Sequence, residues 1–551
     1  MTHRTPLAVK PPRSLDMRLS DGTTLRADIW QPDAPGRFPV LLMRQPYGRR
    51  IASTLVFAHP AWYVAQGYMV VVQDVRGTGD SEGRFRLFAH EEQDGAEAAA
   101  WAADLPGGNG RLGMYGFSYQ AVTQFLALAG GAPLGAMAPA MAGWDIRSDW
   151  AWEGGAFPLA ANLGWGAQMG WIKARHDGDA EAAAAFEAAA RAMPLASPGR
   201  AMPEFMRRHG ALSHYPDWLG NPAPGPYWDA FSPRVRLAGQ PVAVPMLHVG
   251  GWYDQMLMGT LDGHADISAR SSTEQRLVVG PWTHLPWGRR VGAVDFGPAA
   301  SSPIDAMQVA WFDRHLKGMG EAAPALTLFD LGRRAWHDLP AWPAVREHAL
   351  FLGGTGRAAA TSTDGTLAAE PGTAALEAWV QDPWRPVPSL GGHNAQPGGM
   401  QDRAGLDDRA DVATFTAPPL EAPLALCGRV AAEVWVEADQ PSFDLSVVLS
   451  MVAPDGRAWN LTQGHACFDG SQPGPCRVAL RATCATVPAG HALRLSLAGA
   501  AFPAFAVNPG TGSTALDATA AEERIITLML RHGGATPSRV ILPEWRDAAT
   551  P

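Results

Sequence analysis

The sequence contains few cysteines and no long hydrophobic run. Only four cysteines occur among 551 residues, and all lie in the last quarter of the chain, which is too sparse for a disulfide scaffold. No stretch of about 18 uncharged apolar residues is present, as a membrane-spanning helix would require, and the N-terminal residues lack the apolar region of a signal peptide. We therefore expect a cytoplasmic protein with reduced cysteines and no membrane partner.

The chain also lacks any run rich in lysine and arginine. Its 44 basic residues are outnumbered by 53 acidic residues, which gives a formal net charge of −9. Proteins that bind nucleic acid usually present a basic stripe to the phosphate backbone. Nucleic acid is therefore not an expected partner.

A zinc site is the only metal site that the composition suggests. His465 and Cys467 lie near Cys476 and Cys484, but no C-x2-C pair is present and the surrounding residues alternate as in β-strands. We therefore interpret these residues as core positions of strands, and we expect neither a metal nor another cofactor.

Periodicity divides the chain into four segments. Residues 1–144 and 241–346 alternate apolar, strand-like runs with helical patterns, which is typical of an α/β domain with a parallel sheet. Residues 145–240, between them, are rich in tryptophan and alanine and predict an inserted helical cap. Residues 347–551 contain short alternating runs separated by turn dipeptides, which predict a β-sandwich or jelly roll.

Two serines are candidates for a nucleophile. Ser81 lies in GDSEG, the only literal G-x-S-x-G pattern, whereas Ser118 lies in GFSYQA. A nucleophile elbow requires a strand that leads directly into a helix, because that turn exposes the serine Oγ. Ser118 has both flanks, but Ser81 follows a turn-rich segment and precedes no helical pattern. We therefore predict that Ser118 is the nucleophile, although Gln120 departs from the usual pattern and the small residue comes one place later, at Ala121.

The chain resembles the CocE/NonD family, the cocaine-esterase-like serine hydrolases within the wider group similar to X-Pro dipeptidyl-peptidases of family S15. The segments that carry the resemblance are, in order, RQPYG, DVRGTGDSEG, GNGRLGMYGFSY, GGWYDQ, VVGPWTH, FDRHLKG, DPWRPVPSLGG and PSRVILP. The resemblance implies an α/β-hydrolase fold with an inserted helical cap and a C-terminal jelly-roll β domain. Ala121 replaces the glycine that is usual in this family.

Asp254 and His284 are candidates for the other members of a triad. Each lies just past the end of a predicted strand, and the order Ser, Asp, His is that of α/β-hydrolases. From the residues alone, His284 is one of 16 histidines and Tyr47 could be a core tyrosine. The resemblance assigns His284 as the general base, Asp254 as the group that orients it, and the Tyr47 hydroxyl with the Tyr119 backbone N–H as the oxyanion donors.

The substrate prediction depends on residues of the cap and on those after Asp254. The segment with Trp150 and Trp165 is similar to the one that forms the acyl-pocket wall in cocaine esterases. The α-amino-acid ester hydrolases place two acids shortly after the catalytic aspartate, whereas here Asp254 is followed by Gln255, Met256 and Leu257. Only Glu153, in the cap, leaves room for a cationic group. We expect a small-molecule ester substrate with a neutral, apolar or aromatic acyl group, and amides remain open.

Several alternatives also remain open. They are X-Pro dipeptidyl-peptidase activity, α-amino-acid ester hydrolase or β-lactam acylase activity, and a catalytically idle protein that binds a ligand or partner through its β domain. The sequence also leaves a homo-oligomer open.

Overall fold

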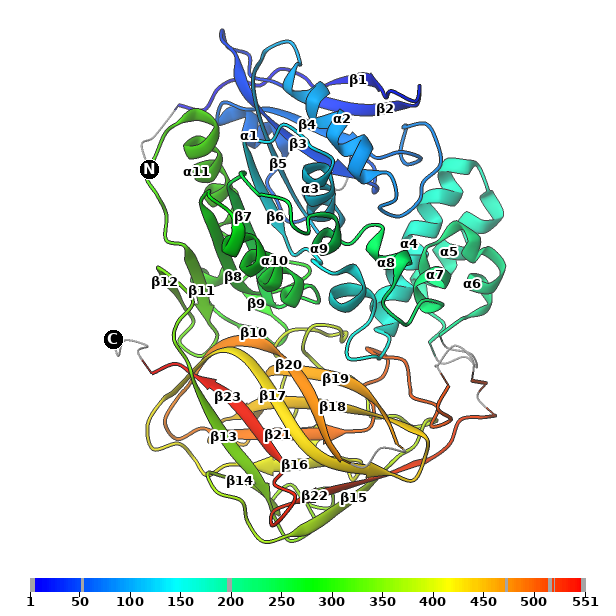
Figure 1. The fold of residues 1–551 in the computed structure, drawn as a ribbon, viewed down its shortest axis with the longest axis vertical. Coiled ribbons are helices and arrows are strands. Elements are labelled where there is room, and N and C mark those ends of the chain that lie inside the picture. Colours follow the sequence, from blue (N-terminus) through cyan, green and yellow to red (C-terminus); the bar gives the residue numbers. More distant parts are fainter. Residues whose placement is uncertain are drawn as a thin grey trace.

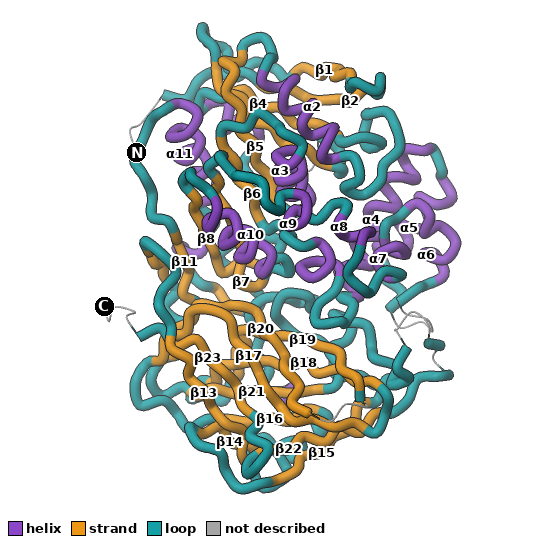
Figure 2. The backbone as a smooth tube through the Cα atoms, in the orientation of Figure 1, coloured by secondary structure: helices purple, strands orange, loops and turns teal. Residues whose placement is uncertain are grey.

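A computed structural model describes residues 5–50, 54–195, 201–470, 474–513, 518–519 and 521–546. It contains one sheet flanked by helices and a second, all-β part below it in the view of Figure 1, with a group of helices to one side. Figure 2 shows that the helices gather mainly around the first sheet and in this lateral group, whereas the other part consists mostly of strands and loops.

The first sheet has ten strands in the order β1-β2-β4-β3-β5-β6-β7-β8-β11-β12, and its seven central strands are parallel. The strands are β1 (Arg13–Arg18), β2 (Thr24–Trp30), β3 (Phe38–Gln45), β4 (Met69–Asp74), β5 (Gly108–Phe117), β6 (Ala136–Ala140), β7 (Met246–Tyr253), β8 (Gln275–Thr283), β11 (Leu326–Asp330) and β12 (Ala335–Leu339). Because the central strands are parallel, their carboxyl ends share one edge, where sites form in such sheets.

Helices cover both faces of this sheet. They are α1 (Pro60–Ala65), α2 (Glu91–Ala103), α3 (Tyr119–Ala129), α10 (Leu257–Arg270) and α11 (Ile304–Lys317). Leu41 and Met43 of β3 belong to the core that includes α1 and α11, whereas Val40 and Leu42 belong to the core that includes α2. Successive side chains of a strand point to opposite faces, so the unbroken apolar run of β3 reflects burial on both sides.

The lateral helices form a cap inserted between β6 and β7. They are the π-helix η2 (Arg147–Ala151), α4 (Leu159–Asp177), α5 (Ala180–Arg191), α6 (Glu204–His209), the 3-10 turn η3 (Gly210–Leu212), α7 (Tyr215–Leu219), α8 (Pro226–Asp229) and α9 (Pro233–Arg236). Gly170 of α4 allows close packing, since a Cβ there would lie 2.3 Å from the ring of Phe186. The aromatic and alanine side chains of the cap form one core with residues of the α/β part.

The second sheet has eleven strands, all from the part of the chain after residue 345. These are β13 (Arg346–Gly353), β14 (Gly365–Ala368), β15 (Ala375–Gln381), β16 (Val412–Thr416), β17 (Leu424–Ala438), β18 (Ser442–Val452), β19 (Ala458–Asp469), β20 (Gly474–Val487), β21 (Ala492–Ala498), β22 (Ile526–His532) and β23 (Arg539–Glu544). Four short elements lie in loops: β9 (Arg290–Val291), β10 (Val294–Asp295) and η4 (Pro298–Ala300) lie between β8 and α11, and α12 (Ala404–Asp407) lies between β15 and β16.

Backbone and side-chain hydrogen bonds join the β part to the rest. The Leu331 N–H donates to the Cys484 carbonyl at 2.9 Å, and the Cys467 N–H donates to the Gly154 carbonyl of the cap at 2.9 Å. The architecture is the predicted α/β-hydrolase fold with a helical cap and a C-terminal jelly roll. No helix within the described ranges combines the length and apolarity needed to cross a membrane.

Candidate active site

Ser118 occupies the turn between β5 and α3. Its backbone has φ 60° and ψ −125°, and it is the N-cap residue of α3. A positive φ is uncommon for a residue other than glycine, and such strain gathers at functional turns. Its side chain lies on the edge formed by the carboxyl ends of the parallel strands, as the strand–turn–helix pattern predicts.

Asp254 and His284 follow the carboxyl ends of β7 and β8. The two side chains form a 2.7 Å hydrogen bond between His284 Nδ1 and Asp254 Oδ1. Asp254 is fully buried, and the His284 ring lies 5.5 Å from the ring of Phe117, the residue before Ser118. Adjacent parallel strands therefore bring the predicted base and its carboxylate to the same edge as the predicted nucleophile.

The Tyr47 hydroxyl lies beside Ser118. It accepts a hydrogen bond from Trp165 Nε1 at 3.2 Å and is within hydrogen-bonding reach of the Ser118 side chain. Burial raises the pKa of Tyr47 well above its ordinary value, although contact with Trp165 and Ser118 opposes this. The phenol therefore keeps its proton and can donate it in a hydrogen bond.

Tyr119 offers its backbone at the same turn. As the first residue of α3, it has an N–H without an acceptor inside the helix. Its side chain is fixed elsewhere, because the hydroxyl donates to Glu91 Oε1 at 2.8 Å and Glu91 pairs with the buried Arg44 at 2.5 Å. This buried network fixes the side chain of Tyr119, while its N–H remains outside the hydrogen bonds of the helix.

Trp150 and Trp165 form an aromatic wall. Their rings stack at 4.5 Å between centroids with an interplanar angle of 23°, and Trp218 contacts both. Met256 is fully buried and belongs to the same apolar cluster. The predicted substrate-binding residues thus lie together, and Trp218 is a third wall residue that the sequence analysis did not single out.

Glu153 is engaged by residues of the jelly roll. His393 Nε2 lies 2.7 Å and Arg481 Nη2 2.9 Å from Glu153 Oε2. Burial alone would raise the pKa of Glu153, but the charges of His393 and Arg481 lower it well below its usual range. The carboxylate is therefore ionised and already paired. The segment GGHN, residues 391–394, is the sequence signal that could have suggested this partner.

The Ser81 side chain is buried and its hydroxyl hydrogen-bonds to backbone groups. Its Oγ donates to the Asp74 carbonyl at 2.7 Å and accepts from the Arg26 N–H at 2.9 Å. The side chain is 1% exposed, and its hydroxyl is used within the protein. The literal G-x-S-x-G pattern therefore marks a loop in which the serine ties two segments of backbone together.

The four residues considered as zinc ligands lie on two strands. His465 Nε2 is 3.0 Å from Asp444 Oδ2, and Cys484 stands opposite Cys427 in the β17–β20 pairing. Among the residues that the structure describes, no group of three or more histidine, cysteine or acidic side chains could hold a metal ion.

Two family models match the chain. The model for X-Pro dipeptidyl-peptidase (S15 family) matches residues 21–286, and that for the X-Pro dipeptidyl-peptidase C-terminal non-catalytic domain matches residues 317–541. The chain is 32% identical to the cocaine esterase of Rhodococcus sp. (strain MB1 Bresler), over 95% of this chain and 97% of that protein. It is 24% identical to a putative serine esterase of Mycobacterium bovis, over 91% of this chain and 94% of that protein.

Solved structures show the same fold. An aminopeptidase from a marine sediment Thaumarchaeota archaeon superposes with a TM-score of 0.80 at 22% identity, covering 99% of this chain and 98% of that one. An α-amino acid ester hydrolase has a TM-score of 0.80 at 23% identity, covering 97% of this chain and 96% of that one.

Asp149, next to Trp150 in the wall, is a buried carboxylate. Its Oδ2 accepts hydrogen bonds from the N–H groups of Trp144 at 3.0 Å and Asp145 at 2.6 Å. Burial raises the pKa of Asp149 to about 7, and the charges of Asp145 and Asp262 add to this, while the two backbone bonds oppose it. Asp149 therefore titrates near neutral pH.

We expect Asp149→Asn to change how stability depends on pH. Between the ordinary pKa of 3.8 and about 7, the native state holds a proton that the unfolded state has lost, so stability falls as pH rises. The neutral amide removes this dependence and keeps an acceptor oxygen. We compare the difference in melting temperature, variant minus wild type, at two pH values. This difference should be more positive at pH 8 than at pH 5 by roughly 2 °C or more.

The control for this comparison is Asp229→Asn, at an exposed position of the same cap. Its melting temperature should differ from that of wild type by the same amount at both pH values. If the difference for Asp149→Asn is also the same at both pH values, Asp149 does not titrate in this range.

Proposed function

Because the chain belongs to the CocE/NonD family of serine hydrolases, we propose that it hydrolyses carboxylic esters through an acyl-enzyme on Ser118. The comparisons thus confirm the family that the sequence motifs indicate. The observation that carries the proposal is the 2.7 Å pair of Asp254 and His284 at the strand edge that also holds the strained Ser118 turn.

In this proposal His284 is the general base. Asp254 accepts the hydrogen bond of His284 Nδ1, which leaves Nε2 without a proton and able to accept one from Ser118 Oγ. The serine oxygen attacks the ester carbonyl carbon, and His284 then donates the proton to the departing alcohol. The imidazolium formed between these steps is stabilised by the buried carboxylate.

Two donors stabilise the tetrahedral oxyanion. The Tyr47 hydroxyl is protonated and lies beside Ser118, and the Tyr119 N–H projects from the first turn of α3. Fixed donors aimed at developing charge are often the largest single contribution to acyl-transfer catalysis. Water activated by His284 then attacks the acyl-enzyme and releases the carboxylic acid.

The surroundings favour a neutral acyl group. Trp150, Trp165 and Met256 offer apolar contact, at about 0.8 kcal/mol for each buried CH₂. An α-ammonium group would require a carboxylate that is free to pair with it. Glu153 is already bound to His393 and Arg481, which argues against the alternatives that require an amine anchor.

Ser118→Ala should abolish ester hydrolysis and labelling by a fluorophosphonate probe. Ser81→Ala should retain turnover within a few fold, because among the described residues its hydroxyl bonds only backbone groups. The measurement is hydrolysis of a chromogenic aryl ester by folded variants. An inactive Ser81→Ala protein beside an active Ser118→Ala protein would reverse the assignment. Absence of labelling in wild type would instead support the catalytically idle alternative.

Tyr47→Phe should lower kcat by roughly 10²–10³-fold with a much smaller change in KM, because it removes one oxyanion donor and retains the ring. Tyr227→Phe is a matched control, since this hydroxyl belongs to the cap and lines a separate cavity. Unchanged kcat in folded Tyr47→Phe protein would limit Tyr47 to a packing role.

A phenylacetyl ester should exceed the matching phenylglycyl ester by at least about tenfold in kcat/KM at pH 7, since tenfold needs only about 1.4 kcal/mol of differential transition-state binding. The two acyl groups differ by the ammonium. A preference for the phenylglycyl ester would falsify the neutral-acyl assignment. Glu153→Gln would then identify the anchor, because it should abolish that preference.

A further inference from the structure

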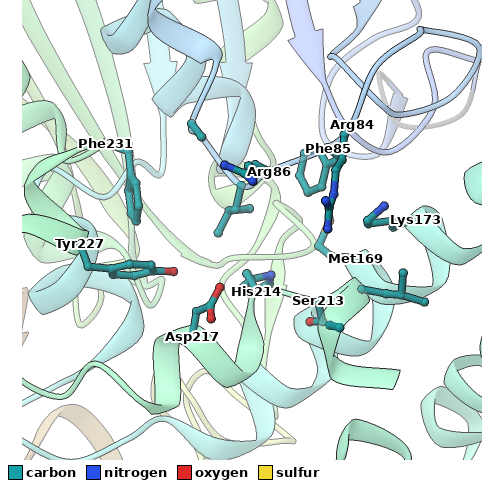
Figure 3. Close-up of a pocket in the computed structure, with 14 residues that line it drawn as sticks. Arg84, Phe85, Arg86, Met169, Lys173, Ser213, His214, Asp217, Tyr227 and Phe231 are labelled. Carbon is teal, nitrogen blue, oxygen red and sulfur yellow. The ribbon is translucent and has the colours of Figure 1, made fainter. Parts of the chain in front are cut away.

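A cavity of about 380 Å³ lies between the cap and the loop that follows the GDSEG segment. Figure 3 shows Arg86, Tyr227, Asp217 and His214 facing its centre, with Arg84 and Lys173 at one side. Its lining also includes the apolar side chains of Phe85, Leu87, Met169, Leu212 and Phe231. The cavity therefore has apolar walls and several polar groups.

His214 is a buried polar side chain without a hydrogen-bond partner among the described residues. It is 7% exposed, and within the described residues neither ring nitrogen has a hydrogen-bond partner. Burial lowers the pKa of His214 to about 3, so the ring is neutral and offers one N–H donor and one acceptor. Buried polar groups in native proteins are nearly always satisfied, and an exception calls for an explanation such as a ligand.

The charged groups around the cavity favour an anion. The guanidinium groups of Arg84 and Arg86 have no hydrogen-bond or ion-pair partner in the described part of the chain. Lys173 differs, because its Nζ pairs with Asp177 at 2.5 Å. Guanidinium groups bind carboxylates in a planar, two-bond geometry, so two arginines remain available for such a group.

We propose that this cavity is a second ligand site, which binds a small organic monocarboxylate with an aromatic or branched apolar body. Arg86 holds the carboxylate, His214 donates its N–H, and Phe85, Met169 and Phe231 contact the apolar body. A single negative charge suits the cavity better than two, because the Asp217 carboxylate also lines it. Carboxylic acids are also the products of the proposed ester hydrolysis.

The cavity is separate from the predicted acyl pocket. Trp165 stands between them, with Trp150 stacked at 4.5 Å and the His214 ring at 4.3 Å between centroids. Trp165 also donates to the Tyr47 hydroxyl. Trp165 and Ser118 are not among the residues that line the cavity, so a ligand there contacts His214 and not the aromatic wall or Ser118.

The test uses 2-naphthoate as the probe and 2-naphthylmethanol as its neutral match. Binding is measured by calorimetry on the full chain, free and with Ser118 covalently blocked by a fluorophosphonate. We expect the carboxylate to bind both forms with the same affinity, and the alcohol to bind at least tenfold more weakly. No binding of the carboxylate at millimolar concentration, or equal binding of the alcohol, overturns the proposal.

Variants locate the site. Arg86→Ala should weaken 2-naphthoate binding by at least tenfold, and His214→Phe should weaken it several fold, with melting temperatures measured for both. Arg175→Ala is the control, since this exposed arginine of α4 does not line the cavity. It should bind normally. If Arg86→Ala binds normally, or if the probe is lost from the blocked enzyme, the carboxylate occupies the acyl pocket and the second site does not exist.

This outcome is distinguishable from failure of the proposed function. Arg86→Ala should hydrolyse esters at the wild-type rate without added carboxylate, because it contacts no triad residue. If the fluorophosphonate labels no serine, the ester-hydrolase proposal fails. The comparison of Arg86→Ala with Arg175→Ala on unlabelled protein then still decides whether the cavity binds.

Discussion

The strained backbone at Ser118 is the constraint on which the site depends. A residue with φ near 60° outside glycine costs about 1–3 kcal/mol and persists only where its surroundings enforce it. Here the Ser118 N–H donates to the Ala140 carbonyl of β6 at 2.9 Å, and the Phe117 N–H donates to Gln120 Oε1 at 3.1 Å. A Cβ at Gly116 would lie 2.4 Å from that of Gln120. Gln120, which departs from the usual motif, therefore closes the turn.

The three parts of the fold each contribute to the surroundings of this turn. The parallel sheet places Asp254 and His284 at one edge, and the cap supplies the aromatic wall. The jelly roll contributes His393 and Arg481, which bind Glu153 of the cap. His393 is also near enough to Asp254 for that carboxylate to act on its pKa. Loss of packing between the jelly roll and the cap would therefore expose Glu153 and alter the charge around the proposed triad.

Local patterns predicted much of the fold and of the candidate site. The runs at β3 and β4 are buried on both faces, and Ser118 has the predicted strand and helix on either side. The partners of Glu153 could not be predicted from such patterns, because they lie more than 200 residues away and meet it only through domain packing. The raised pKa of Asp149 could not be predicted for a related reason, because it depends on burial, which composition does not reveal.

The GDSEG loop has a structural role that does not require its serine to be a nucleophile. Gly79 lacks a Cβ that would lie 2.2 Å from Asp74 Oδ2, and Asp74 binds both the N–H and the guanidinium of Arg49, at 2.6 and 2.5 Å. Arg49 also pairs with Asp80 at 2.7 Å. These bonds fix the segment that carries Tyr47 two residues earlier. The loop therefore supports the segment that carries Tyr47, the proposed oxyanion donor, and its serine secures the loop itself.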